Sequence, residues 1–409
     1  MNYQERAIKI LERINELASI SEQPGIITRT YGFPSFVKGA QLIADWMIEA
    51  GLQTRTDNIG NVRGRWVSKI ANTKTLIIAS HIDTVVNAGK FDGPLGVIMG
   101  LGMIENIANS KIELPFNIEL IAFADEEGVR FHTTYLGSKV VAGSFDKTLL
   151  SRTDKAGILL RDAIHNIGGQ PDLLQQDKIQ EEILGYFEIH IEQGPVLYES
   201  KDPVAVVSAI AGQKRVELIF TGVAGHAGTV PMDMRQDALC CAADCINNIE
   251  QFALSHKHEI VATVGKLEIE NSASNVIPGK VICSLDLRSA DEVRLSYAAT
   301  ALQNILNEIC EDRNIGFQWN LIQEAPPVIC DQELTNKLSE AIEAAGYSSI
   351  YLVSGAGHDA VPMSVICPVS MMFVRCYKGI SHNPLEDVEE QDIAAAIKVA
   401  DHFITKLKP

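Results

Sequence analysis

The sequence predicts an α/β protein with a mostly parallel sheet, interrupted by an inserted α+β domain. In its first half, short apolar runs alternate with segments of helical periodicity, a pattern typical of a parallel sheet. A central segment changes to strands of alternating polar and apolar residues, and the last part returns to the first pattern. The length of 409 residues exceeds what a single core normally supports, so two domains are expected.

The predicted strands outside the insert are short apolar runs that end next to polar residues. They cover 75–80, 117–125, 185–194 and 369–376. Helical periodicity predicts helices over 97–109 and 331–345.

The central segment predicts a self-contained domain. Its strands are expected at 214–222, 259–270, 280–288 and 317–322, and its helices at 235–256 and 291–313. The resulting order, β-α-β-β-α-β, is the ferredoxin-like arrangement. We therefore predict one domain built from 1–211 and 328–409, with an insert over 212–327.

Composition excludes several classes of protein. The net charge of −17, without a basic stripe, argues against nucleic-acid binding. The chain lacks the run of about 18 apolar residues that a membrane span needs, and its first residues do not resemble a signal peptide. All eight cysteines fall between Cys240 and Cys376 without a C-x-x-C pair, so we expect reduced core thiols in a cytoplasmic protein.

Histidine and acidic residues gather where the predicted strands end, which is where α/β sheets bind ligands. The candidate metal ligands are His81, Asp92, Glu127, His190 and His382. Imidazole and carboxylate suit zinc, manganese or cobalt. One catalytic zinc uses three protein ligands, so five candidates indicate two ions that share a carboxylate.

Each of these signals is weak by itself. A single buried histidine is more often a hydrogen-bonded core residue, and adjacent glutamates usually face solvent. Glu126 and Glu127, however, follow the apolar run Ile121–Ala124, where two carboxylates are costly without a cation. Asp83, two residues after His81, fits a role in orienting that imidazole.

Five motifs resemble the successive metal motifs of the di-metal peptidase family that contains aminoacylase and bacterial carboxypeptidase G. They are SHIDTV, FDGPLGV, FADEEGVRF, HIEQGPVL and GISHNP. Further motifs, GHAGTVPMDMRQD, SASNVIPG and SGAGHDA, resemble the amidohydrolase branch, which includes N-carbamoyl-L-amino-acid hydrolases and allantoate amidohydrolases. Peptidase relatives commonly have an acidic ligand where His190 stands.

The resemblance implies a role for each metal residue. His81, Asp92 and His190 would hold one ion, and Asp92, Glu127 and His382 the other. Glu126 would be the general base, and Asp83, which orients His81, would belong to the catalytic residues. The Asp92–Gly93 peptide would be cis.

The resemblance also makes the insert a lid and a dimerisation domain. His226 would cross to the partner's active site in a homodimer and assist catalysis there. The residues implied in substrate binding are Gln193, Gln213, His226, Asn275, Arg288, Gly357 and His358. From the residues alone, His226 can be a solvated loop residue, and Arg288 can form a surface ion pair.

The expected substrate is a small ureido carboxylate. Gln213, where carbamoylases commonly have an apolar residue, favours allantoate, hydrolysed to ureidoglycine or ureidoglycolate with release of ammonia and carbon dioxide. The alternatives are an N-carbamoyl-L-amino acid and, less favoured, a peptide. The Gly355–Ala360 segment mimics a nucleotide-binding loop but has Arg375 where an acidic residue is needed. We interpret it as a substrate loop.

Overall fold

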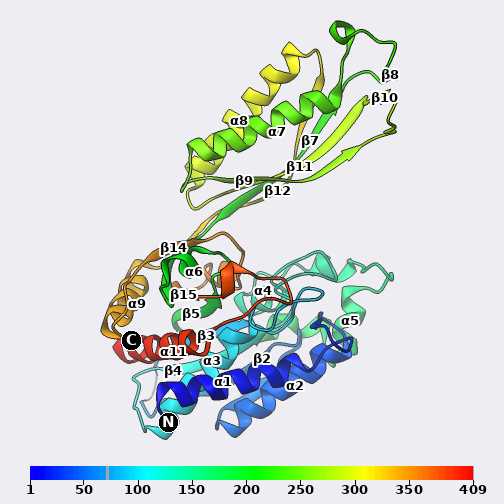
Figure 1. The fold of residues 1–409 in the computed structure, drawn as a ribbon. Coiled ribbons are helices and arrows are strands. Elements are labelled where there is room, and N and C mark those ends of the chain that lie inside the picture. Colours follow the sequence, from blue (N-terminus) through cyan, green and yellow to red (C-terminus); the bar gives the residue numbers. More distant parts are fainter. Residues whose placement is uncertain (71–72, 409) are drawn as a thin grey trace. The chain divides into compact units, whose positions relative to one another are not determined.

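The computed structural model describes residues 1–70 and 73–408, and the chain forms two compact units. The first comprises Met1–Ser208 and Cys330–Pro409, and the second Ala209–Ile329. Figure 1 shows the course of the chain through each unit. The insert predicted over 212–327 lies inside the second unit.

Within the described residues, a nine-stranded sheet has the order β1-β2-β4-β3-β5-β15-β6-β13, with β14 beside β6. Its central strands β4, β3, β5 and β15 are parallel, whereas β1, β2, β6 and β13 pair antiparallel. The strands are β1 (Gln53–Thr56), β2 (Val62–Trp66), β3 (Thr75–His81), β4 (Asn117–Phe123), β5 (Ile183–Ile191), β6 (Val204–Ile210), β13 (Val328–Ile329), β14 (Tyr351–Ser354) and β15 (Val369–Val374).

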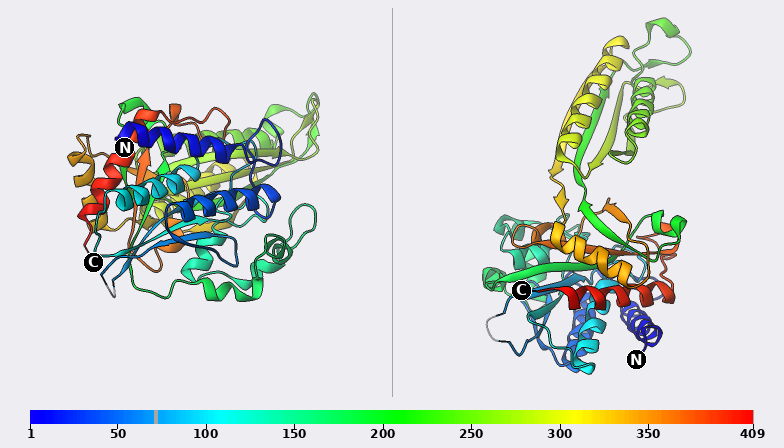
Figure 2. Two further views of the ribbon diagram at one scale, coloured as in Figure 1. Left: turned by 90° about the horizontal axis from the view of Figure 1, so that it is seen from below. Right: turned by 90° about the vertical axis from the view of Figure 1, so that its left-hand side faces the viewer.

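Helices cover both faces of this sheet (Figures 1 and 2). The α-helices of the first unit are α1 (Tyr3–Ala18), α2 (Pro34–Glu49), α3 (Pro94–Asn109), α4 (Leu136–Ala142), α5 (Leu160–Asn166), α6 (Val196–Ser200), α9 (Gln332–Ala344), α10 (Ala360–Met363) and α11 (Glu390–Lys406). Short 3-10 helices occur at η1 (Lys147–Ser151), η2 (Pro171–Asp177) and η4 (Tyr377–Gly379).

Helix α3 is buried on nearly all sides, which explains its apolar sequence. It packs on β3 and β5, and both α1 and α11 pack against it. Pro94 occupies its first turn, where proline is favoured because its missing N–H would have no helical partner. The helix therefore begins directly after Asp92 and Gly93, which places Asp92 beside the end of β3.

The second unit is a four-stranded antiparallel sheet with two helices on one face (Figure 1). The sheet order β12-β7-β11-β9 follows the ferredoxin-like pattern. Its main elements are β7 (Gly212–Thr221), α7 (Ala238–Ser255), β9 (Val261–Ile269), β11 (Lys280–Ser289), α8 (Glu292–Asp312) and β12 (Gly316–Ala325). The short β8 (Gly225–His226), η3 (Met232–Met234) and β10 (Val276–Ile277) complete it.

The predicted fold class is confirmed, with a parallel core in the large sheet and the β-α-β-β-α-β insert. Strands β1, β2, β6 and β13 of this sheet were not predicted. All eight cysteines are free, and only Cys240 among them is exposed. Among the described residues, no helix has the length and apolarity that a bilayer crossing requires.

Candidate metal centre

Four parallel strands bring the predicted metal ligands to one edge of the large sheet. His81 is the last residue of β3, and His190 lies one residue before the end of β5. Glu127 follows β4, and His382 follows β15 after one turn of 3-10 helix. Because neighbouring parallel strands end at the same edge, residues far apart in the sequence meet there.

Asp92 stands at the centre of this group. Its Oδ1 lies 3.2 Å from His190 Nε2 and 3.8 Å from His81 Nε2. Its Oδ2 lies 3.1 Å from His382 Nε2, which is itself 3.3 Å from Glu127 Oε1. One carboxylate thus has a separate oxygen for each of two neighbouring sets of ligands.

The spacing in both sets is that of metal ligands. The sets are His81 with Asp92 and His190, and Asp92 with Glu127 and His382, and within each the ligand atoms lie within 4.8 Å of one another. An ion bound at about 2.1 Å to each atom would hold such atoms about 3 to 4 Å apart. Imidazole and carboxylate together suit a divalent transition ion.

The charge at this edge also fits cations. Asp83, Asp92, Asp125 and Glu126 are all buried, and the buried Asp125 Oδ2 has no hydrogen-bond donor among the described residues. Burial raises the pKa of Glu126 well above its ordinary value, and the neighbouring carboxylates of Glu127, Asp359 and Asp83 raise it further. Buried carboxylates at this density are costly unless positive charge accompanies them.

Asp83 supports the site differently from what the sequence led us to expect. His81 Nδ1 lies 3.1 Å from the main-chain oxygen of Asp83 but 3.7 Å from its carboxylate. The carboxylate instead accepts the backbone N–H groups of Glu126 and Glu127, at 3.0 and 3.2 Å. The main chain of Asp83 therefore orients the imidazole, while its side chain fixes the turn that carries the two glutamates.

Gly93 is required by both its conformation and its surroundings. Its φ is 85°, and a Cβ at this position would lie 2.4 Å from the His81 ring. The expected cis Asp92–Gly93 peptide is wrong, because no cis peptide occurs within residues 1–70 and 73–408. The turn into α3 is instead made by the positive φ of Gly93, which glycine adopts readily.

Three polar residues hold Asp92 in position through contacts with its side chain or backbone. Only one of them, Gln193, was predicted from the sequence as a site residue. Gln193 Nε2 and Ser381 Oγ donate to Asp92 Oδ2 at 2.8 and 2.6 Å. Glu386 Oε1 accepts the backbone N–H groups of Phe91 and Asp92, and its Oε2 lies 3.1 Å from Ser381 Oγ. Gln193 is predicted to bind substrate; its Nε2 donates to Asp92, while its buried Oε1 has no hydrogen-bond donor among the described residues.

His358 lies behind the metal ligands. It is 1% exposed, its Nε2 lies 2.6 Å from Ser354 Oγ, and its ring packs edge-on against His190 at 4.6 Å. Burial and the neighbouring His190 lower its pKa well below the ordinary value. A Cβ on Gly357 would lie 1.8 Å from Tyr135 Oη, so this loop packs tightly against the core.

The candidate residues of the second unit form two pairs. Gln213 on β7 is the cross-strand partner of Arg288 on β11, and the Arg288 guanidinium also contacts both carboxylate oxygens of Asp286. His226 is exposed, and the N–H of Ala227 next to it donates to the main-chain oxygen of Asn275. The N–H of Gly228 donates to His226 Nδ1, so a neutral His226 carries its proton on Nε2.

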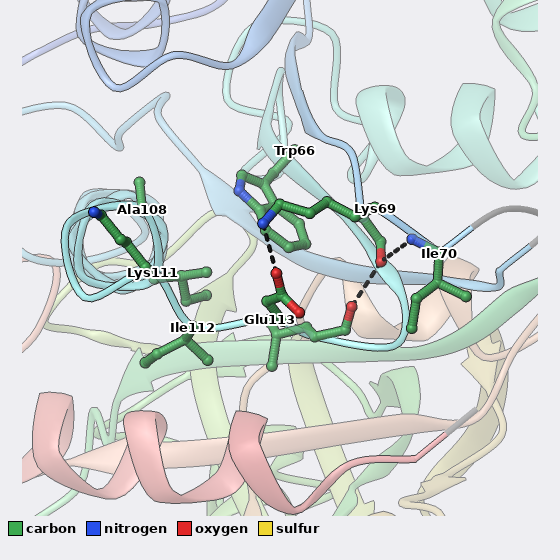
Figure 3. Close-up of a pocket in the computed structure, with 10 residues that line it drawn as sticks. Trp66, Lys69, Ile70, Ala108, Lys111, Ile112 and Glu113 are labelled. Carbon is green, nitrogen blue, oxygen red and sulfur yellow. Dashed lines mark hydrogen bonds and ion pairs between the residues drawn. The ribbon is translucent and has the colours of Figure 1, made fainter.

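A cavity of about 250 Å³ lies elsewhere in the first unit, near Trp66 and Leu114 (Figure 3). Its lining is largely apolar, with one ion pair of 2.5 Å between Lys69 and Glu113. Because Leu114 precedes β4, the cavity lies toward the amino ends of the parallel strands. It includes none of the candidate ligands.

A parallel sheet with clustered imidazoles and carboxylates at its carboxyl edge is the arrangement of a metal-dependent hydrolase. The chain belongs to peptidase family M20/M25/M40, whose sequence model matches residues 77–406. The predicted family and the expectation of a hydrolytic enzyme are thereby confirmed.

Individual relatives cover nearly the whole chain. Allantoate deiminase 2 of Glycine max is 38% identical over 97% of this chain and 88% of its own. An N-carbamoyl-L-amino acid amidohydrolase of Geobacillus stearothermophilus is 35% identical over 98% of both chains. The crystal structure of an amidase of the hydantoinase/carbamoylase family from Burkholderia multivorans superposes with a TM-score of 0.91, at 33% identity over 97% of each chain.

Proposed function

We propose that this enzyme hydrolyses a ureido C–N bond of allantoate, using two divalent ions, zinc or manganese. The products are ureidoglycine, or the ureidoglycolate formed from it, and a carbamate that decomposes to ammonia and carbon dioxide. The observation that carries the proposal is the position of Asp92, which offers one oxygen to His81 and His190 and the other to His382. The identity of 38% to an allantoate deiminase supports the substrate.

The ligand sets divide between two ions. His81, Asp92 and His190 would hold the first, and Asp92, Glu127 and His382 the second. When bound, such ions polarise a carbonyl oxygen and lower the pKa of a water molecule.

Glu126 moves the proton in this reaction. Its buried carboxylate stands next to the candidate ligand Glu127 in the turn after β4, where it can accept a proton. It takes a proton from the attacking water and returns it to the leaving nitrogen, as a general base that becomes a general acid. Asp83 keeps Glu126 in place through the backbone N–H groups of the turn.

The pairs in the second unit would recognise the substrate. Arg288 can turn its guanidinium fork from Asp286 to a substrate carboxylate. Gln213, its cross-strand neighbour, can donate to a second ureido arm, which allantoate has and a carbamoyl amino acid lacks. His226, with its proton on Nε2, can donate to the developing oxyanion.

The length of β7 favours a dimer with shared sites. Gln213 lies at the start of this ten-residue strand, and His226 follows its far end. At about 3.4 Å per residue the strand alone extends about 30 Å. A small ureido carboxylate cannot contact both ends, so we propose that His226 serves the active site of a partner subunit in a homodimer.

A second candidate is hydrolysis of an N-carbamoyl-L-amino acid. It is favoured by the 35% identity to an enzyme with that name, which matches 98% of both chains. The same metal ligands and the same general base would serve both substrates. The preference for one substrate over the other would therefore depend on residues of the second unit.

The test is ammonia release by metal-reconstituted enzyme from allantoate, from N-carbamoyl-L-amino acids and, as amine release, from dipeptides. We expect the highest kcat/KM for allantoate. A Gln213→Leu variant should lose allantoate activity while it keeps or gains carbamoylase activity. Faster turnover of a carbamoyl amino acid by the unaltered chain would overturn the choice of substrate.

A further inference from the structure

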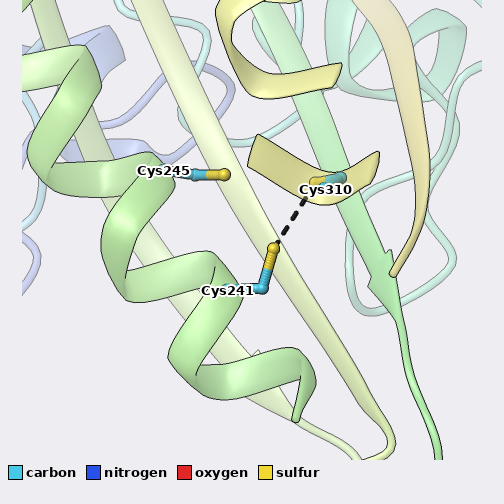
Figure 4. Close-up of side chains that lie close together, drawn as sticks. All are labelled: Cys241, Cys245 and Cys310. Carbon is cyan, nitrogen blue, oxygen red and sulfur yellow. Dashed lines mark hydrogen bonds between the residues drawn. The ribbon is translucent and has the colours of Figure 1, made fainter. Parts of the chain in front are cut away.

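Three cysteines converge in the core of the second unit. Cys241 and Cys245 lie one turn apart on α7, and Cys310 faces them from α8 (Figure 4). The sulfurs of Cys241 and Cys310 are 3.5 Å apart, and all three sulfurs lie within 4.8 Å of one another. Each side chain is at most 1% exposed. We call this group the three-thiol cluster.

The spacing suits three sulfurs that share one ion. Sulfurs bound at about 2.3 Å to a common centre lie about 3.3 Å apart for bond angles near a right angle, and about 4.0 Å apart in a planar arrangement. The distance of 3.5 Å between Cys241 and Cys310 falls in this range.

The number of available ligands and the net charge of the resulting complex determine which kind of ion the three-thiol cluster would bind. Among the described residues, no fourth histidine, cysteine or carboxylate joins the three-thiol cluster, whereas structural zinc sites almost always have four ligands. Three thiolates with a divalent ion leave a net charge of −1, which is costly in an apolar core. A trivalent ion gives a neutral complex. Arg313, whose positive charge acts on Cys241, is half-exposed and pairs with Asp244.

We propose that Cys241, Cys245 and Cys310 form a binding site for one thiophilic trivalent ion, represented by arsenic(III). Arsenous acid and three thiols form three As–S bonds, while three As–O and three S–H bonds break and three water molecules leave. The oxidation state of arsenic does not change, so no oxidant or reductant is needed. The product joins α7 to α8 inside the second unit.

The three-thiol cluster lies near helix ends, which gives the ion a short path from solvent to the thiols. Cys241 is the fourth residue of α7, and Cys310 is the third from the end of α8. Helix ends fray before helix centres, so opening one terminal turn of either helix exposes a thiol. Binding is therefore expected in the folded protein without global unfolding.

The test is native mass spectrometry of the full chain, with its catalytic metals loaded, after treatment with arsenite. The expected adduct is one arsenic less three hydrogens, which reports three As–S bonds. Single variants Cys241→Ala, Cys245→Ala and Cys310→Ala should lose this adduct. Cys283→Ala removes another buried thiol of the same unit that does not belong to the cluster, and it should retain the adduct.

A second measurement needs no variant. When the protein is alkylated during unfolding in denaturant, arsenite bound beforehand should protect these three cysteines, while the exposed Cys240 and the buried Cys283 remain reactive. The proposal is overturned if the adduct is absent at saturating arsenite, or if the protected cysteines are others. Tighter binding of cadmium(II) than of arsenic(III) would contradict the charge argument.

Discussion

Asp92 holds its Oδ1 3.2 Å from His190 and its Oδ2 3.1 Å from His382. These histidines come from β5 and from the segment after β15, neighbouring parallel strands of the sheet. The hydrogen bonds of His190 and His382 outweigh the burial of Asp92 and hold its pKa well below the ordinary value. A carboxylate that stays ionised between two sets of ligands is suited to join two ions.

Glu126→Gln keeps the shape of the side chain but removes its ability to accept a proton. We expect kcat to fall by about 10²- to 10⁴-fold, the usual contribution of a general base. Bound metal, measured by mass spectrometry of the elements, should remain unchanged. A variant that keeps near-normal turnover would exclude Glu126 as the base.

Glu386→Ala should weaken metal binding although Glu386 is not a candidate ligand. Its carboxylate accepts the backbone N–H groups of Phe91 and Asp92, so its loss frees the loop that carries Asp92. Loss of such supporting contacts typically costs 10- to 100-fold in metal affinity. Competition with a chelator measures this affinity. The exposed neighbour Asp387 provides the control. If Asp387→Ala lowered the metal affinity as much as Glu386→Ala does, a specific role of Glu386 in holding the Asp92 loop would be contradicted.

Gly93→Ala should lower both stability and metal affinity, because its Cβ would overlap the His81 ring and its φ is positive. The strain alone is expected to cost about 1 to 3 kcal/mol in free energy of unfolding. Gly102→Ala on the same helix is the control. Its Cβ would meet no atom closer than 3.5 Å, and the gain in helix propensity is about 1 kcal/mol. Denaturant unfolding compares the two variants, and similar effects of both would contradict the steric explanation.

Asp57 should make stability fall as the pH rises. Burial raises its pKa from 3.8 to about 6, although Arg63 and the hydrogen bonds of Asn61 oppose the shift. Because the folded-state pKa is raised, the contribution of Asp57 is fully present below the unfolded-state pKa and is lost as the pH passes about 6. Asp57→Asn removes this loss, so the melting temperature of the variant should rise relative to wild type between about pH 4 and pH 7. A constant difference across this range would contradict the assigned pKa.

The parallel strands and the candidate metal ligands could be predicted from the sequence because both follow simple sequence patterns. Strands β3, β4 and β5 are apolar runs with histidine or acidic residues at or next to their carboxyl ends. Strand β2 escaped prediction because Arg63 is buried in it through an ion pair with Glu119, which breaks the apolar pattern. Strand β6, in contrast, is an apolar run rich in valine, a pattern typical of a buried strand.

The supporting contacts could not be predicted, because they depend on tertiary structure. Glu386 meets Phe91 across almost 300 residues of sequence, and no local pattern distinguishes it from an exposed acid such as Asp387. The Asp83 carboxylate binds backbone N–H groups rather than His81, a choice set by the turn after β4.

The sharing of Asp92 between two ions is tested most directly by counting bound metal. Equilibrium dialysis with zinc or manganese should give two ions per chain for wild type. His190→Ala and His382→Ala should each retain one ion, and Asp92→Ala should bind neither tightly. If Asp92→Ala retained one ion with undiminished affinity, Asp92 would not join the two sites.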